Sequence, residues 1–163
     1  MMLSELEQLL ACRRERESRA AAALRQCRLR LDQAKARAEA EQRRLEDHHR
    51  DRKMRQDKLH RRSLRGRLSK NQIDDLNIEL DLMGEETDTL QRRVQEAEAV
   101  VGQVTKEAED AAALYRRHRQ AGDRWGHLVD DVAETERRHA EHAEEFAVED
   151  DLGDRRIGGQ GGL

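Results

Sequence analysis

Proline is absent from this chain of 163 residues, and only 2% of the residues are aromatic. Without proline, nothing in the sequence forces a helix to break. One Trp, one Tyr and one Phe are too few large side chains to fill a layered globular core. No apolar run approaches the roughly 20 residues of a transmembrane helix, and the N-terminus lacks the features of a signal peptide. We therefore expect a cytoplasmic protein without a globular core.

Cysteine is also scarce. Cys12 and Cys27 are the two cysteines of the chain, and on a single helix that rises 1.5 Å per residue they are about 22 Å apart. A disulfide needs Cα atoms within about 7 Å. We expect both cysteines to be reduced thiols.

Charge is abundant and unevenly distributed. Charged residues make up 41% of the chain, and the formal net charge is -3. Residues 1–70 hold 21 Lys and Arg against 11 Asp and Glu, whereas residues 71–163 hold 11 against 24. The two halves are therefore electrostatically complementary, either within one chain or between two copies.

The second half carries two apolar rows with a period of seven that continue without interruption from Ile73 to Phe146. One row is Ile73, Leu80, Thr87, Val94, Val101, Ala108, Tyr115, Gly122, Val129, Glu136 and Ala143. The other is Leu76, Met83, Leu90, Ala97, Val104, Ala111, His118, Trp125, Val132, His139 and Phe146. Such a pair of rows is the seam of a coiled coil, so this helix requires a partner helix.

The first half carries matching rows. One row is Leu3, Leu10, Glu17, Leu24, Leu31, Ala38, Leu45, Arg52 and Leu59. The other is Leu6, Arg13, Ala20, Cys27, Ala34, Glu41, His48, Arg55 and Arg62. The seam becomes polar after Leu45, which predicts a looser coil toward residue 62 because Arg stems can still cover a seam.

Turn signals separate the two halves. Gly66 is suited to end a helix in the left-handed conformation, Ser69 and Gln72 fit a capping box, and Leu68 with Ile73 fits a hydrophobic staple. A turn at this place pairs residues whose numbers sum to 135, so that seam positions face seam positions. The predicted fold is all-α, with two long helices forming an antiparallel coiled-coil hairpin: helix 1 about 3–64, turn about 65–69 and helix 2 about 70–150.

The second helix is longer than the first, so Glu136, His139, Ala143 and Phe146 lack a partner within the chain. Phe146 is therefore a candidate anchor for another protein, with fraying of the helix as the alternative. We expect Trp125 to pack against Leu10. The glycine-rich residues 151–163 are expected to be disordered.

No motif indicates an enzyme, a cofactor or a metal site. Glu46 with His49 and Glu136 with His139 have the Glu-x-x-His spacing of carboxylate-bridged metal sites, but the predicted register places the two pairs far apart. The chain has no phosphate-binding loop or nucleophile elbow. A two-helix coil also offers no enclosed pocket.

A basic segment at residues 50–70 is the strongest surface feature, with ten Lys and Arg against Asp51 and Asp57. Three interpretations are open. The segment is a solvated helix end, a docking site for an acidic protein surface, or a nucleic-acid contact. The last is the weakest, since no aromatic residues that stack on bases lie among the basic ones.

A leucine-rich start (Met2-Leu3-Ser4-Glu5-Leu6-Glu7-Gln8-Leu9-Leu10), an Arg/Glu/Ala-rich arm and a longer returning helix resemble the YscO/FliJ family of central stalk proteins of type III secretion and flagellar export. The resemblance covers residues 1 to about 150 and concerns length, architecture and character. It implies a non-enzymatic stalk at the cytoplasmic face of the membrane export apparatus, where it couples the hexameric secretion ATPase to the export gate protein and binds export chaperones.

The resemblance also implies which partner each end of the hairpin contacts. Leu3–Arg19 and Ala121–Phe146 form the ATPase-facing end, with the candidate contacts Leu3, Arg13, Arg16, Trp125, His139 and Phe146. Residues 50–70 form the gate-facing tip, with the candidate contacts Arg52, Lys53, Arg55, Arg62, Arg65 and Arg67. We expect a monomer without direct membrane insertion. The alternatives are a self-assembling structural coiled coil and a basic nucleic-acid adaptor.

Overall fold

A computed structural model describes residues 2–66 and 68–158 of the chain. Two helices account for nearly all of them, α1 (Met2–Arg65) and α2 (Lys70–Gly158). They pack against each other as a hairpin, and the described residues contain no strand. The all-α class and the antiparallel helical hairpin are therefore confirmed.

The capping box predicted at the start of α2 is present. The Ser69 amide donates to Oε1 of Gln72 at 3.0 Å, and the Gln72 amide donates to Oγ of Ser69 at 3.3 Å. The Ile73 amide donates to the carbonyl of Ser69 at 3.1 Å. Two amides that an α-helix leaves unpaired at its N-terminus are thus satisfied locally, which fixes where α2 begins.

The end of α1 lies where expected but has a different conformation. α1 ends at Arg65, next to Gly66, yet no glycine among the described residues has a positive φ. The left-handed conformation predicted for Gly66 is therefore wrong. Ser63 Oγ donates to the carbonyl of His60 at 2.7 Å, and Arg62 and Arg65 place positive charge in the last turn, where the helix dipole favours it.

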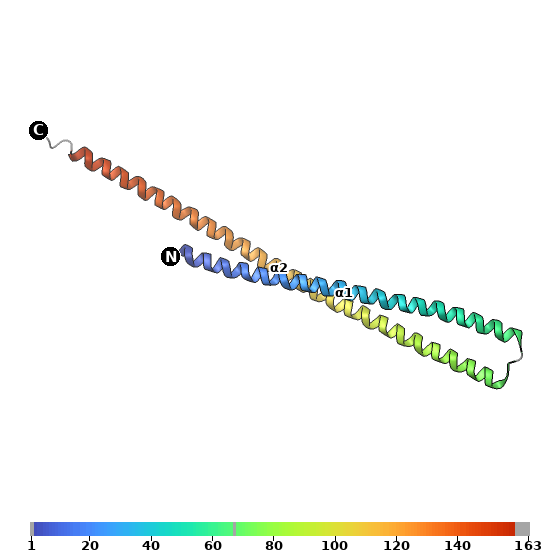
Figure 1. The fold of residues 1–163 in the computed structure, drawn as a ribbon. Helices are drawn as coiled ribbons and strands as arrows, with labels where there is room; N and C mark the ends of the chain where they lie inside the picture. The colour runs from blue at the N-terminus through green and yellow to red at the C-terminus, as the bar shows by residue number, and fades with distance from the viewer. Residues whose placement is uncertain (1, 67, 159–163) are drawn as a thin grey trace. The chain divides into compact units, whose positions relative to one another are not determined.

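Packing between the helices groups into two compact units. Unit 1 consists of Met1–Ala22 and Ala113–Leu163, and unit 2 consists of Ala23–Ala112. In each unit a stretch of α1 runs antiparallel to a stretch of α2 (Figure 1).

The predicted seam forms the core of both units. In unit 2, Leu45, Leu90 and Val94 form a buried cluster, and Nε2 of His48 lies 2.8 Å from Oγ1 of Thr87. Both pairs, 45 with 90 and 48 with 87, sum to 135, which confirms the register. In unit 1, Ala20 and Val129 are buried.

The seam is open near the turn. We call residues 49–66 and 68–86 the tip; both stretches belong to unit 2, and the two helices diverge toward the turn (Figure 1). Arg55 and Arg62 are exposed although they occupy seam positions, and Ile73 and Leu80 are 46% and 36% exposed. The looser coil predicted beyond Leu45 is confirmed.

The C-terminal end of α2 departs from expectation. The helix continues to Gly158, so the prediction of disorder is wrong for residues 151–158. Ion pairs one turn apart support this stretch: Nη2 of Arg155 lies 3.4 Å from Oδ2 of Asp151. Arg155 and Arg156 also place positive charge in the last turn. The remainder of the expected tail, residues 159–163, lies outside the described residues.

Neither helix, over the residues that the structure describes, contains a stretch long and apolar enough to cross a membrane.

Candidate partner-binding surfaces

The free end of the hairpin lies in unit 1, where the predicted contacts Leu3, Arg13 and Trp125 occupy seam positions and Arg13 meets Trp125. All three side chains are half-buried. The guanidinium carbon of Arg13 lies 5.9 Å from the centroid of the Trp125 ring, a cation–π contact that the heptad pattern did not predict. Arg16 points outward and is exposed. Of these four residues, Arg16 is therefore the one most available to a partner.

An ion-pair cluster next to Gly122 was also missed by the sequence analysis. Nη1 of Arg14 donates to Oε2 of Glu17 at 2.9 Å and to Oδ1 of Asp123 at 3.3 Å. A Cβ atom at Gly122 would lie 3.1 Å from the same Glu17 oxygen and 3.2 Å from Nη1 of Arg14, so the glycine makes room for the pair. The hydrogen bond to Glu17, followed by that to Asp123, raises the pKa of Arg14.

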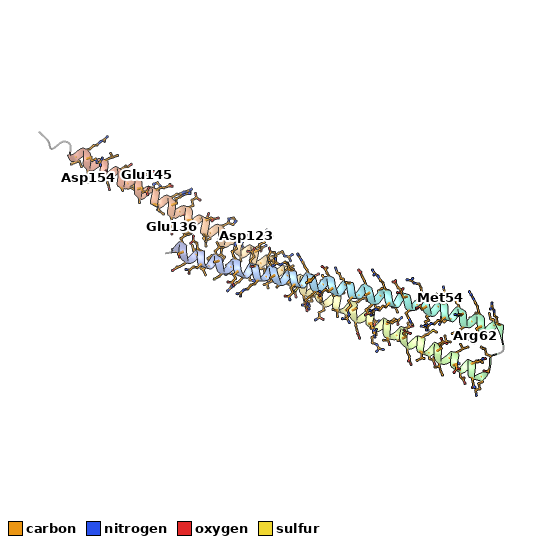
Figure 2. All side chains as sticks on the ribbon, in the orientation of Figure 1. Met54, Arg62, Asp123, Glu136, Glu145 and Asp154 are labelled. Carbon is orange, nitrogen blue, oxygen red and sulfur yellow. The ribbon has the colours of Figure 1, made fainter. Side chains whose placement is uncertain are left out.

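The last part of α2 extends beyond the N-terminal end of α1 and carries His139 and Phe146. Every residue from 134 to 152 is exposed, and Glu145 and Asp154 lie where no other helix accompanies α2 (Figure 2). We call residues 134–158 the overhang. It holds nine Asp and Glu against four Arg, and its large exposed apolar side chains are Phe146, Val148, Leu152 and Ile157. The overhang is an acidic helix with apolar side chains that no part of the hairpin covers.

The predicted tip residues differ from one another in environment. Lys53, Arg55, Arg62 and Arg65 are exposed, and within the described part of the chain none of them forms an ion pair within 4.0 Å. Arg52 is half-buried, and its Nη1 donates to Oγ1 of Thr87 at 2.8 Å, so it belongs to the seam rather than to a free surface. Arg67 lies outside the described residues.

The hairpin places an acidic stretch beside the basic one. Residues 49–65 of α1 hold eight Lys and Arg and two Asp, a net charge of +6, whereas residues 68–86 hold six Asp and Glu and one Lys, a net charge of -5. The tip is therefore basic along α1 and acidic along α2. This arrangement weakens the nucleic-acid interpretation, because the phosphate backbone favours a surface of one positive sign.

A polar layer crosses the seam of unit 2 at Thr87. Its hydroxyl donates to the carbonyl of Met83 at 2.8 Å. Having used its only proton there, it must accept from both His48 and Arg52. Nε2 of His48 therefore carries a proton, and Nδ1 faces Oε2 of Glu86 at 3.7 Å. The sequence placed His48, Arg52 and Thr87 on the seam but gave no signal that they bond to one another.

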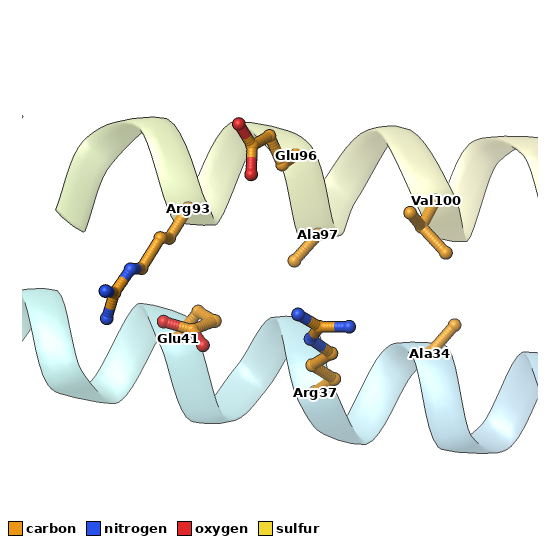
Figure 3. A pocket seen from close by; sticks show the side chains of 7 residues that line it. All are labelled: Ala34, Arg37, Glu41, Arg93, Glu96, Ala97 and Val100. Atoms are coloured by element: carbon orange, nitrogen blue, oxygen red, sulfur yellow. The ribbon is translucent and has the colours of Figure 1, made fainter. Parts of the chain in front are cut away.

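A second polar feature lies at Glu41, which is 8% exposed. Oε1 accepts from Arg44 at 3.2 Å, whereas Oε2 is buried without a hydrogen-bond partner. Beside it lies a groove lined by Ala34, Arg37, Glu41, Arg93, Glu96, Ala97 and Val100, into which Arg37 and Arg93 extend from opposite helices (Figure 3). The small seam residues Ala34 and Ala97 leave this space.

Reactive groups are dispersed along both helices. Cys12 and Cys27 are free thiols, and the described residues contain no group of three or more His, Cys, Asp or Glu side chains placed to hold a metal ion. The overhang and the tip instead present exposed helix faces that other helices can contact.

No protein-family model, curated protein or solved structure matches this chain.

Proposed function

We propose that the protein is a non-enzymatic stalk of a bacterial type III secretion export apparatus. In this role it couples the hexameric secretion ATPase to the membrane export gate at the cytoplasmic face and binds export chaperones. The observation that carries the proposal is the hairpin with one helix longer than the other, because it leaves an uncovered helix at the free end.

The overhang supports an ATPase contact by its composition. Phe146 is 67% exposed in the overhang, where the ion pairs of the described residues join side chains of α2 to one another, such as Arg138 with Glu134 at 2.7 Å. Exposed aromatic side chains are typical anchors of protein interfaces. A stiff pair of helices inside a six-subunit ring touches the subunits unequally, which biases their states and promotes assembly or turnover.

The tip supports a gate contact by its unpaired charge. Lys53, Arg55, Arg62 and Arg65 are exposed on α1 near the turn, where they can reach an acidic protein surface. Exposed charges of this kind steer association and fix orientation more than they add affinity.

The test is the rate of ATP hydrolysis by the cognate secretion ATPase with and without the purified chain. We expect stimulation of turnover and of hexamer formation, and loss of both with Phe146→Ala. Met54→Ala is the matched control, since Met54 is 69% exposed but belongs to unit 2. An ATPase whose turnover and assembly do not change when the wild-type chain is added would refute the proposal.

The gate contact is tested separately. Arg55→Glu with Arg62→Glu is expected to weaken capture of the soluble part of the gate protein and to leave ATPase stimulation intact. A charge reversal that abolishes both activities would show that the two ends do not act independently.

A further inference from the structure

One edge of the tip is uncharged in a chain that is 41% charged. Each residue of this edge comes directly after a seam residue. On α1 that seam residue belongs to the row that contains His48, and on α2 to the row that contains Leu76. Within the tip they are His49, Gln56 and Ser63 on α1 and Asn77 and Gly84 on α2, and Gln42 and Gln91 continue the two rows one heptad farther from the turn; Lys70, one heptad before Asn77 at the start of α2, is the charged residue in line with them. Coiled coils usually place Glu and Lys at such flanking positions, and the average composition would give about three charges among seven residues.

The opposite edge has the usual character. It consists of Arg44, Asp51, Lys58 and Arg65 on α1, and Gln72, Glu79, Glu86 and Arg93 on α2. Seven of these eight residues are charged. The lack of charge is thus specific to one edge, and depletion of charge is the compositional signature of an interface core.

The uncharged edge borders a groove of about 390 Å³ between the helices. Five apolar side chains line it, Leu59, Leu68, Ile73, Leu76 and Leu80, and its other lining residues are uncharged polar ones. Ile73 and Leu80 occupy seam positions, yet they are 46% and 36% exposed. Farther from the turn, Met83 and Leu90 are 3% and 9% exposed. The tip therefore has an apolar seam that its own two helices do not close.

We propose that the uncharged edge of the tip binds the same edge of a second copy of this chain. The two tips form a four-helix bundle about a two-fold axis that runs along the helices, with α1 of each copy against α2 of the other. Every neighbouring pair of helices is then antiparallel, as in other bundles. This departs from the expectation of a monomer, which assumed a closed seam.

The charges of the two helices favour this two-fold axis over one perpendicular to the helices. The axis sets a stretch of net charge +6 against one of net charge -5 in both halves of the interface. A perpendicular axis would set α1 against α1 and bring the two basic stretches together. An isologous interface needs a surface that complements itself, and a tip with one basic and one acidic helix has that property.

The register of the hairpin, applied between copies, names the contacts. Because an axis along the helices keeps residues whose numbers sum to 135 at the same height, Lys53 on the outer flank of the edge lies within one residue of Asp81 of the second copy, and His60 within one residue of Asp74. One turn beyond the tip, Glu46 lies within one residue of Asp88, which has the same charge. The interface should therefore end near residue 46, which is also where the intramolecular seam closes around Leu45.

The first experiment measures the mass of the full chain by light scattering and sedimentation equilibrium across a wide range of concentrations. The mass is expected to rise from 18.9 kDa to twice that value. Gln56→Glu with Asn77→Asp adds two carboxylates to the edge at almost constant shape, and it should raise the dissociation constant at least tenfold. The control pair, Gln103→Glu with Asn71→Asp, makes the same changes at exposed positions off the edge and should leave the constant unchanged.

The second experiment tests the charge pairing by recovery of dimerisation rather than by its loss. Lys53→Asp and Asp81→Lys are each expected to dimerise poorly alone, because each brings like charges together across the axis. A mixture of the two variants should form a heterodimer with at least the wild-type affinity. Intramolecular effects cannot produce this rescue.

Three results would overturn the proposal: a chain that stays at 18.9 kDa at every concentration, an association that the control pair weakens as much as the edge pair, or single variants that dimerise as well as their mixture. A pure chain that stays monomeric while a protein of different sequence covers the edge would equally overturn it. The mass and mixing measurements use the purified chain and its variants alone, so their outcome does not depend on the stalk proposal.

Discussion

Thr87 offers a quantitative test of the polar layer in unit 2. The residue is 6% exposed, and its hydroxyl accepts hydrogen bonds of 2.8 Å from both His48 and Arg52. Thr87→Val keeps the shape and the branched Cβ but removes the acceptor, so two donors lose their partner.

The expected loss follows from typical magnitudes. A neutral hydrogen bond contributes about 0.5–1.5 kcal/mol and one from a charged donor about 1.5–3 kcal/mol. Arg52 is half-buried and regains water, so its bond counts at the low end. The added methyl group returns about 0.8 kcal/mol through burial. We expect a net destabilisation of about 1–2 kcal/mol, or roughly 2–8 °C in Tm for a chain of this size.

The assay is thermal and urea unfolding followed by circular dichroism at the helical band. Thr89→Val is the matched control, because Thr89 Oγ1 also donates to a carbonyl one turn back, that of Glu85 at 3.0 Å, but is exposed. The control should change the free energy of unfolding by less than about 0.5 kcal/mol. The double variant His48→Leu with Thr87→Val removes the acceptor together with one of its two donors and should recover part of the lost stability. If Thr87→Val is no less stable than Thr89→Val, the described hydrogen bonds do not hold the seam.

Further outcomes follow from individual positions. Gly102→Ala should stabilise the helix by about 1 kcal/mol, because a Cβ there meets nothing within 4 Å, whereas Gly122→Ala should gain less in the same unfolding assay because it displaces Glu17. Glu41→Leu should raise the free energy of unfolding by about 1–2 kcal/mol, since it removes a buried oxygen without a partner; a loss of stability would show that the carboxylate is paired in solution. Phe146→Ala should leave Tm unchanged within about 1 °C, because the side chain is 67% exposed; a lower Tm would mean that the overhang packs on the hairpin.

The seven-residue apolar repeat predicted the fold because it reflects one physical requirement: a narrow apolar stripe on a helix must face another helix. Leu45, Leu90 and Val94 were on the predicted rows and form a buried cluster. The start of α2 was equally predictable, since a capping box involves only residues three apart.

Details that depend on long side chains were not predictable. Arg13 reaches the Trp125 ring, and Arg14 reaches Asp123, yet nothing in a seven-residue repeat states where a flexible guanidinium ends. The prediction of disorder for residues 151–158 was wrong because it rested on the glycine content of this stretch. It did not take into account the ion pair between Asp151 and Arg155, which are one helical turn apart. Among the candidate contacts, the sequence located the exposed Phe146 correctly but could not tell that Arg52 is bonded within the seam.

The open tip also has a consequence for how the chain folds. A hairpin zips most quickly when its first contacts lie next to the turn, since short loops close at the lowest entropic cost. Here the residues nearest the turn, Ile73 and Leu80, remain partly exposed, and burial begins at Met83 and Thr87, which are 3% and 6% exposed. Since Arg52 bonds to Thr87, the chain must close a loop of more than 30 residues before burial compensates for the lost entropy. Folding should be slower than the local helices alone would suggest, and mutations at Leu45 or Leu90 should slow it most.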